Sequence, residues 1–389
     1  MSLPVKNKIQ LIIAAGIGNI LKYYDFALYA VYAHIIGQTF FRNDNSLSNL
    51  LFSFSVFASG FIVRPLGAYI FGYIADKYDR KTSMYYSISL MGLATIGIGL
   101  LPGYDSLGIF SVIFLVLLRL AQGISAGGEY STSAMAVLEN VEQQRGLIGG
   151  ILVSTCVLGT IVSTFVSLGL DQLNLSIASW RIAFVLGGMV AFVGFYLRRY
   201  LPELVSNKKE MFHIQQLKNY KSEILTIVGI GAVNGSVIYS IYGFLPNFLA
   251  QVTSFPFIEL KKISLWALFA LIIISPIGGY LSQKKPETIS MTSAVLLLVL
   301  SPIFYGMFGT NAYHLCVSAF LSLGILGGFF VGAQNYLSFQ LIPQSIRCLS
   351  VGLGYSLGMA LCGGTVGSIS LIIYKYTENI QMTSLWLCI

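Results

Sequence analysis

Five charged side chains lie inside long apolar segments of the chain: Lys22, Asp25, Arg64, Arg119 and Glu129. A charge in the interior of a membrane is costly, and it usually has a partner, faces water or serves a function. Three cations against two anions leave one positive charge over when all five are ionised. A cavity with that surplus suits an anionic group such as a solute carboxylate. The alternative is a network of ion pairs that only ties the helices together.

Arg119 is the best candidate for holding a carboxylate. A guanidinium stays charged and can grip both carboxylate oxygens at once. Gln122 and Glu129 follow on the same helix and share one broad face with it. We therefore predict that Arg119, Gln122 and Arg64 bind substrate. The alternative is that Arg119 pairs permanently with Asp25 or Glu129.

A carboxyl group in a dry site can bind and release a proton during a transport cycle. Asp25 and Glu129 are the two candidates. Lys22 precedes Asp25 by three residues, so the two side chains are neighbours on one helical face and are expected to pair. Such a pair would hold Asp25 ionised, and we predict that Glu129 is the better proton carrier.

These residues must be positioned by membrane helices. The chain has 389 residues, of which 56% are hydrophobic and only 10% are charged, against about 25% charged in a soluble domain. Eleven apolar segments of membrane length follow one another from about residue 10 to about residue 373. A twelfth begins near Gln381, but the sequence ends at Ile389, short of the roughly 20 residues that span a bilayer. We predict an all-α membrane protein whose twelfth helix is truncated.

A polar connector divides the helices. Residues 201–222 contain two glutamates and four lysines, and we predict that they form a cytoplasmic linker. The linker separates a six-helix half, 1–200, from a second half, 223–389, with five full helices and part of another. An internal repeat supports this division, because the stretch Gly-Tyr-Ile-Ala-Asp-Lys from Gly72 returns as Gly-Tyr-Leu-Ser-Gln-Lys from Gly279.

Most lysines and arginines fall in the loops on one side of the predicted membrane. By the positive-inside rule that side is the cytoplasm, and the N-terminus lies there. This distribution accounts for the net charge of +8 without nucleic acid. The five cysteines show no metal-ligand spacing. We find no nucleotide motif, metal cluster or nucleophile–base pair, and predict a protein that is not an enzyme and needs no cofactor or metal.

One charged turn between two apolar segments carries a motif. Gly72-x-x-x-Asp76-x-x-x-Arg80-Lys81 places a small residue, a carboxylate and two cations where the bilayer core gives way to water. It resembles the signature loop between helices 2 and 3 of the major facilitator superfamily, although Asp79 stands where that family usually has glycine. The resemblance implies that Gly72, Asp76, Arg80 and Lys81 form a gating loop.

Three further stretches narrow the resemblance. They run from Gly18 to Tyr29, from Val63 to Gly67 and from Leu118 to Tyr130. Together they resemble the metabolite:proton symporter family, which includes carriers of proline and betaine, α-ketoglutarate, citrate and shikimate. The chain departs from that family at Lys22, where glutamate is usual.

The resemblance implies two six-helix halves with the substrate held between them near the middle of the membrane. Helices 1, 4, 7 and 10 line the cavity in that family. This makes further polar residues substrate-binding candidates: Tyr29, Asn234, Tyr239, Tyr242 and Asn335. The alternative for the tyrosines is ordinary packing.

We therefore predict a secondary active transporter that carries a small carboxylate or zwitterionic solute together with protons, by alternating access. It is expected to act as a monomer in the bacterial inner membrane. The alternative is a transport-inactive remnant, or a transporter-like sensor that binds a solute without moving it.

Overall fold

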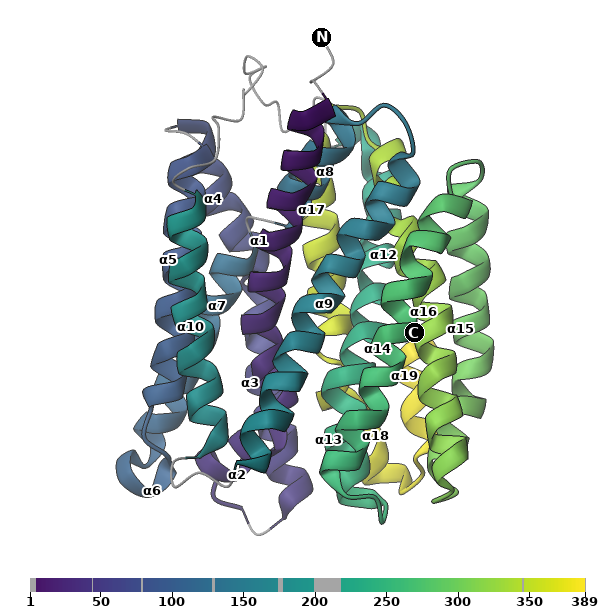
Figure 1. The fold of residues 1–389 in the computed structure, drawn as a ribbon. Helices are drawn as coiled ribbons and strands as arrows, with labels where there is room; N and C mark the ends of the chain where they lie inside the picture. Colours follow the sequence, from purple (N-terminus) through teal and green to yellow (C-terminus); the bar gives the residue numbers. More distant parts are fainter. Residues whose placement is uncertain are drawn as a thin grey trace.

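The structure is a computed structural model, and it describes residues 5–43, 45–77, 80–127, 130–173, 178–198, 218–344 and 346–388. Within these ranges the chain is helical and contains no strand, so the all-α prediction is confirmed. The long helices stand side by side in one bundle (Figure 1). Of the predicted linker, residues 201–217 lie outside the described residues.

We call residues 5–198 the N-terminal half. Its helices are α1 (Val5–Val31), α2 (Ala33–Phe40), α3 (Ser46–Ile62), α4 (Arg64–Lys77), α5 (Arg80–Leu100), α6 (Tyr104–Leu107), α7 (Ile109–Gly127), α8 (Tyr130–Asn140), α9 (Arg145–Gln172) and α10 (Ser179–Arg198).

We call residues 218–388 the C-terminal half. Its helices are η1 (Lys218–Tyr220), α12 (Lys221–Tyr239), η2 (Ser240–Phe244), α13 (Leu245–Val252), α14 (Phe257–Leu281), α15 (Pro286–Phe308), α16 (Tyr313–Leu341), α17 (Arg347–Gly358), η3 (Met359–Gly363), α18 (Val366–Thr377), η4 (Gln381–Ser384) and α19 (Leu385–Cys388). Both η2 and η3 are π-helices that continue the helices before them.

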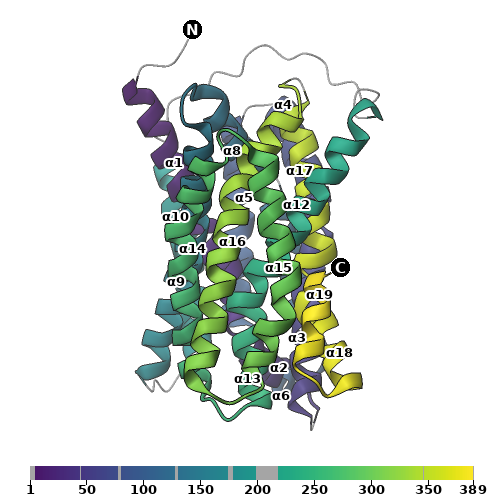
Figure 2. The same cartoon turned by 90° about the vertical axis from the view of Figure 1, so that its right-hand side faces the viewer.

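Nine helical spans among the described residues are long and apolar enough to cross a membrane, and Tyr86–Leu100 adds a shorter apolar helix. They cross the bundle from the end where α1 begins, the near end, to the end where α2, α6 and α13 lie, the far end (Figures 1 and 2). The apolar segments that the sequence predicts at about 145–170 and 263–282 are longer in the structure. α9 continues to Gln172, and α14 begins at Phe257.

Two glycines let α3 and α7 come into backbone contact. A Cβ atom added to Gly123 would lie 1.9 Å from the carbonyl oxygen of Gly60. Membrane helices without a driving force from water rely on such close packing of small residues. Arg119 lies about one turn before Gly123, so the contact presses its side chain against α3, where a Cβ on Gly60 would lie 3.1 Å from the Arg119 Nε atom.

This contact predicts a difference between two glycine substitutions. Gly123→Ala should destabilise the protein strongly, because the added methyl group meets backbone that cannot rotate away. Gly169→Ala in α9 is the control, since its Cβ would have no atom within 4 Å and alanine favours a helix over glycine. Detergent-solubilised yield and melting temperature measure both. Equal melting temperatures for the two variants would contradict the packing account.

Candidate functional site

Arg119 lies in the middle of α7 and is completely buried. Its Nη1 atom donates a hydrogen bond of 2.7 Å to Oε1 of Gln122. The Nε2 atom of Gln122 in turn donates to Oγ1 of Thr95 in α5, at 2.8 Å. The Gln122 amide is therefore engaged in orienting the guanidinium, which is a positioning role that differs from the direct substrate contact predicted for it.

The other nitrogen atoms of the Arg119 guanidinium are available to donate hydrogen bonds to a ligand. Its Nε and Nη2 atoms are buried and have no hydrogen-bond partner among the described residues, and neither has Nε of Arg64. No carboxylate among the described residues forms an ion pair with either arginine. Permanent pairing of Arg119 with Asp25, one of the alternatives, is therefore not found. Glu129 lies outside the described residues.

Arg64 is the first residue of α4, directly after the break between α3 and α4, and its side chain lies against the same ring as that of Arg119. Pro65 has no N–H group to continue the hydrogen-bond ladder, and the helix is interrupted just before Arg64. The Arg64 Cζ atom lies 4.3 Å from the ring centre of Phe26, and the Arg119 Cζ atom lies 4.0 Å from the same centre. Such cation–π contacts hold a cation in an apolar place without neutralising it.

Other aromatic rings complete the enclosure of the two guanidiniums. The ring centre of Phe61 lies 4.1 Å from Cζ of Arg64, while the ring centres of Phe57 and Tyr29 lie 4.6 and 4.8 Å from Cζ of Arg119. The Tyr29 hydroxyl donates to the carbonyl oxygen of Ser53 at 3.3 Å. Tyr29, predicted to bind substrate, thus offers its ring to Arg119 and uses its hydroxyl to join α1 and α3.

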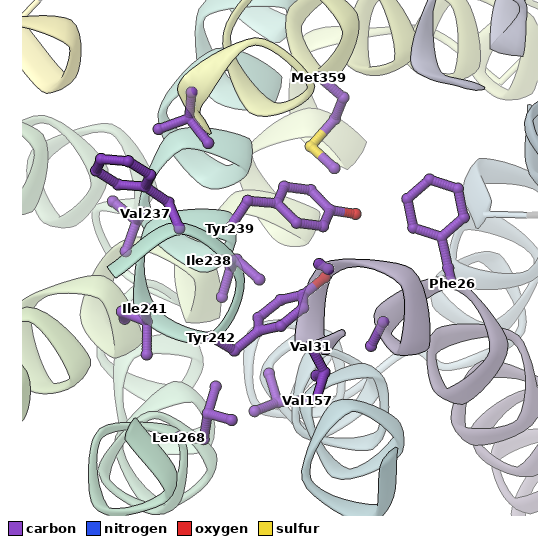
Figure 3. Packing of buried hydrophobic residues seen from close by; sticks show 14 of the residues in the cluster. Phe26, Val31, Val157, Val237, Ile238, Tyr239, Ile241, Tyr242, Leu268 and Met359 are labelled. Carbon is purple, nitrogen blue, oxygen red and sulfur yellow. The ribbon is translucent and has the colours of Figure 1, made fainter. Parts of the chain in front are cut away.

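The C-terminal half contributes Tyr239 and Tyr242. The Tyr239 ring lies 5.0 Å from that of Phe61 and 5.4 Å from that of Tyr242. Figure 3 shows the Tyr239 hydroxyl directed away from its own helix toward Phe26. Both tyrosines lie where α12 passes into the π-helix η2, and π-helices of this kind are frequent at functional sites. The structure thus brings Arg64, Arg119, Tyr29, Tyr239 and Tyr242 together at the meeting of the halves.

Asp25 and Lys22 do not form the predicted pair. Asp25 is 2% exposed, forms no ion pair among the described residues, and has a buried Oδ1 atom without a hydrogen-bond partner. It faces α10, where a Cβ on Gly187 would lie 2.6 Å from that oxygen. Lys22 lies half-buried one turn earlier in α1. The predicted ion pair between Lys22 and Asp25 is therefore not found in the structure.

Two predicted ligands of the C-terminal half make contacts between helices. Asn234 of α12 donates from Nδ2 to Oε1 of Gln334 in α16. Asn335 donates from Nδ2 to the carbonyl oxygen of Gly149 in α9, at 3.1 Å, and so joins the two halves. Neither lies among the ring contacts of Arg119 and Arg64, so the structure does not bring these two residues to the aromatic enclosure.

The predicted gating loop is described only in part. Gly72 and Asp76 belong to α4, while Arg80 and Lys81 belong to α5, and their side chains lie outside what the structure describes.

The structure contains one ion pair at the near end that the sequence analysis did not predict. Nη1 of Arg347, which begins α17, lies 2.9 Å from Oε1 of Glu139 in α8. Arg145 lies nearer to Glu139 in the sequence, but its Nε donates to the carbonyl oxygens of Leu138 and Val141.

Sequence reasoning missed the aromatic enclosure of the arginines. Phe26 directly follows Asp25 in the motif of the first helix, and Phe57 and Phe61 recur at helical spacing before Arg64. A search for aromatic residues within one helical turn of an intramembrane arginine would have found Phe61. Phe26 and Phe57 reach Arg119 only through tertiary packing.

The described residues thus form a bundle of apolar helices with buried cations where the two halves meet. A family model described as "Major Facilitator Superfamily" matches residues 15–370. The chain therefore belongs to the major facilitator superfamily, whose members named below are transporters, and it is not an enzyme.

Curated relatives match almost the whole chain. The alpha-ketoglutarate permease of Escherichia coli K12 is 29% identical over 386 residues, which cover 95% of this chain and 88% of that protein. The proline/betaine transporter of the same strain is 24% identical over 402 residues, covering 97% of this chain and 80% of that protein. These relatives agree with the predicted metabolite symporter family.

Solved structures show the same fold. A D-xylose-proton symporter superposes with a TM-score of 0.75 at 14% identity, covering 98% of this chain and 95% of that one. The human organic anion transporter MFSD10 gives 0.69 at 14% identity, covering 99% and 97%. Multi-pass membrane insertion follows from the apolar spans and these matches.

The geometry predicts that Arg119→Lys is not a conservative change. Lysine keeps the charge but loses the planar fork and the bond that orients it through Gln122. We expect affinity for a carboxylate ligand to fall about 10- to 100-fold, as for other hydrogen bonds to charged groups. Binding is measured by scintillation proximity on detergent-solubilised protein. Arg347→Lys, at the near end, is the matched control, and equal losses in both variants would argue against a central clamp.

Proposed function

We propose that this protein is a proton-coupled symporter of a small carboxylate-bearing solute that works by alternating access. The observation that carries the proposal is the pair of buried guanidiniums, in which three nitrogen atoms that carry N–H groups have no acceptor among the described residues. Buried donors are almost always satisfied, so an unsatisfied set at one place calls for a ligand. A carboxylate supplies acceptors for these donors and the negative charge that the two cations lack.

The surrounding rings fit the rest of such a solute. Phe26, Phe57 and Phe61 provide an apolar wall from the N-terminal half, and Tyr239 closes it from the other half. Relatives named for alpha-ketoglutarate and for proline and betaine support a carboxylate as the shared group. The solute carboxylate would take the place of the contacts that Arg119 and Arg64 now make with the rings.

Asp25 is the residue that we assign to the proton. A carboxylate buried without a cation or donor is costly, whereas a protonated carboxyl group tolerates such a place. Closing the protein around Asp25 therefore favours a bound proton, and opening to water allows its release. The absence of the expected pair with Lys22 removes the reason for preferring Glu129, which becomes the alternative carrier.

The two halves defined above are the bodies that would move, with residues 201–222 as the linker between them. The excess of lysine and arginine at the near end supports a cytoplasmic N-terminus. The far end then faces outward. We propose that the working unit is a monomer in the bacterial inner membrane.

Uptake into proteoliposomes tests the proposal with labelled 2-oxoglutarate, proline and glycine betaine. The unaltered protein should accumulate one of them on an imposed pH gradient, acid outside. A protein that binds a solute but shows neither accumulation nor counterflow would instead be the sensor or inactive remnant.

Asp25→Asn tests the assignment of the proton site. We expect accumulation on a pH gradient to be lost, because asparagine does not titrate, while counterflow of substrate in the absence of a gradient persists. Glu129→Gln is the comparison and should keep at least part of the accumulation. Accumulation by Asp25→Asn at the level of the unaltered protein, together with its loss in Glu129→Gln, would move the proton site to Glu129.

A further inference from the structure

A buried ion pair joins the two halves at the far end. Nζ of Lys261, in the second turn of α14, lies 2.8 Å from Oδ2 of Asp171, the penultimate residue of α9. The lysine side chain is 3% exposed and the aspartate side chain 15%. The other ion pairs of the described residues are more exposed, including the one between Arg347 and Glu139 at 11% and 21%.

The aspartate is held by the N-terminal half. Its Oδ1 atom accepts hydrogen bonds from Ser179 of α10, at 2.6 Å, and from the hydroxyl of Tyr32, at 3.5 Å. Ser167, one turn earlier in α9, donates to Oδ2 at 3.4 Å. Asp171 therefore keeps donors in its own half whether or not Lys261 is present.

The lysine is the group that crosses from the C-terminal half. Beyond Asp171, its ammonium donates to Oγ of Ser167 at 2.5 Å and lies over the rings of Tyr32 and Phe257, at 4.8 and 4.5 Å. Two of these three contacts belong to the N-terminal half. Separation of the halves at the far end would therefore leave Lys261 without most of its partners and expose it to water.

Local stability does not explain the pair. A negative charge in the last turn of a helix opposes the helix dipole, so Asp171 is unfavourable in α9 taken alone. Burying two charges also rarely improves on apolar packing of the same volume. What an ion pair offers is a contact that can open at low cost, because water solvates both charges once they separate.

Hydrogen bonds also join the two halves toward the far end. Oδ1 of Asn247 in α13 accepts from the backbone N–H of His34 at 3.0 Å, and Ser46 Oγ donates to Oε1 of Gln251 at 2.5 Å. All of these contacts link the N-terminal half to the C-terminal half. Several of the contacts that join the halves toward the far end are therefore polar, and water can replace such contacts.

The ion pair also has a connection to the central site. Tyr32 lies at the break between α1 and α2, three residues after Tyr29 and seven after Asp25. Tyr32 touches both members of the pair. A tilt of α1 that accompanies changes at Asp25 or Tyr29 would therefore move Tyr32 and change its contacts with Asp171 and Lys261.

We propose that Lys261 and Asp171 form the gate of the far end, joined while that end is closed and separated when it opens. The proposal rests on alternating access, the proposed function. In this proposal the two residues set the equilibrium between the two open states, while the substrate and the proton bind at the central site.

Distance measurements test the gate without depending on transport. Spin labels are placed on cysteines at Leu107 in α6 and Tyr313 at the start of α16, which are 38% and 53% exposed at the far end of the two halves. The five native cysteines are replaced by alanine. The parent should show a main distance for the closed far end, and Lys261→Gln should raise the ratio of longer to shorter distances about tenfold or more.

Two comparisons make the result specific. Lys262→Gln is the matched control, because Lys262 pairs with Glu259 on its own helix, at 2.7 Å, and is exposed. It should leave the distances unchanged. Asp171→Asn should shift them as Lys261→Gln does, and the double variant should add little, since both changes remove one interaction. Unchanged distances in Lys261→Gln, or an equal shift in Lys262→Gln, would overturn the proposal.

An apolar replacement tests whether the contact has to open. Asp171→Leu combined with Lys261→Met should fold, because volume-matched apolar pairs replace buried ion pairs well. It should keep the short distance and lose solute uptake, since apolar surfaces resist exposure to water. Normal uptake by this variant would overturn the gate, and so would failure of every variant of the pair to fold, which would assign the two residues to folding. If the unaltered protein shows no solute uptake while the variants still shift the spin-label distances, the result would count against the proposed function alone.

Discussion

The cation–π contact between Arg119 and Phe26 is the interaction on which the centre of the molecule depends. A guanidinium with a Cζ atom 4.0 Å from a ring centre is held in an apolar place and still carries its full charge. Had a carboxylate of the chain taken that position, the cation would be neutralised and of little use to a ligand. The ring therefore keeps a positive charge buried and available, which neither water nor an ion pair would do.

The helix packing serves this contact. Arg119 reaches Phe26 because α7 approaches α3 at Gly60 and Gly123, where no side chain separates the two backbones. Gln122 and Thr95 then fix one edge of the guanidinium from α7 and α5. The remaining edge is left with unsatisfied donors. Small residues, a bridging amide and an aromatic ring thus act together to present one charged edge to the meeting of the halves.

Much of this arrangement was predictable from the sequence, and the reason is the scarcity of charge. In a chain with 10% charged residues, every arginine inside an apolar segment stands out, and Arg64 and Arg119 were found in this way. The helical fold followed from segment length. The partners of these residues were less predictable, because Gln122, Asp25 and Tyr29 have several neighbours at helical spacing and only tertiary packing decides among them.

The ion pair between Lys261 and Asp171 was not predicted, for a physical reason. Hydropathy ends a predicted helix where charges appear, so the limits near residues 170 and 263 placed Asp171 and Lys261 in loops. The structure continues α9 to Gln172 and begins α14 at Phe257, which brings both residues inside helices. Each charge is tolerated there because the other lies opposite. Pairs of this kind are invisible to a rule that judges one segment at a time.

Both ends of the bundle are joined across the halves in this structure, by Lys261 and Asp171 at one end and by Arg347 and Glu139 at the other. A protein that exposes its site to one side at a time has to break one of these contacts while keeping the other. The two ion pairs differ in burial. Under alternating access, removing one or the other would therefore shift the equilibrium between the two open states by different amounts. A ligand that neutralises Arg119 and Arg64 acts midway between the two ends. It shifts the equilibrium only as far as it binds the closed arrangement more tightly than the open ones. Under the proposed function, that difference in affinity would arise at the guanidinium donors that are unsatisfied in the closed arrangement.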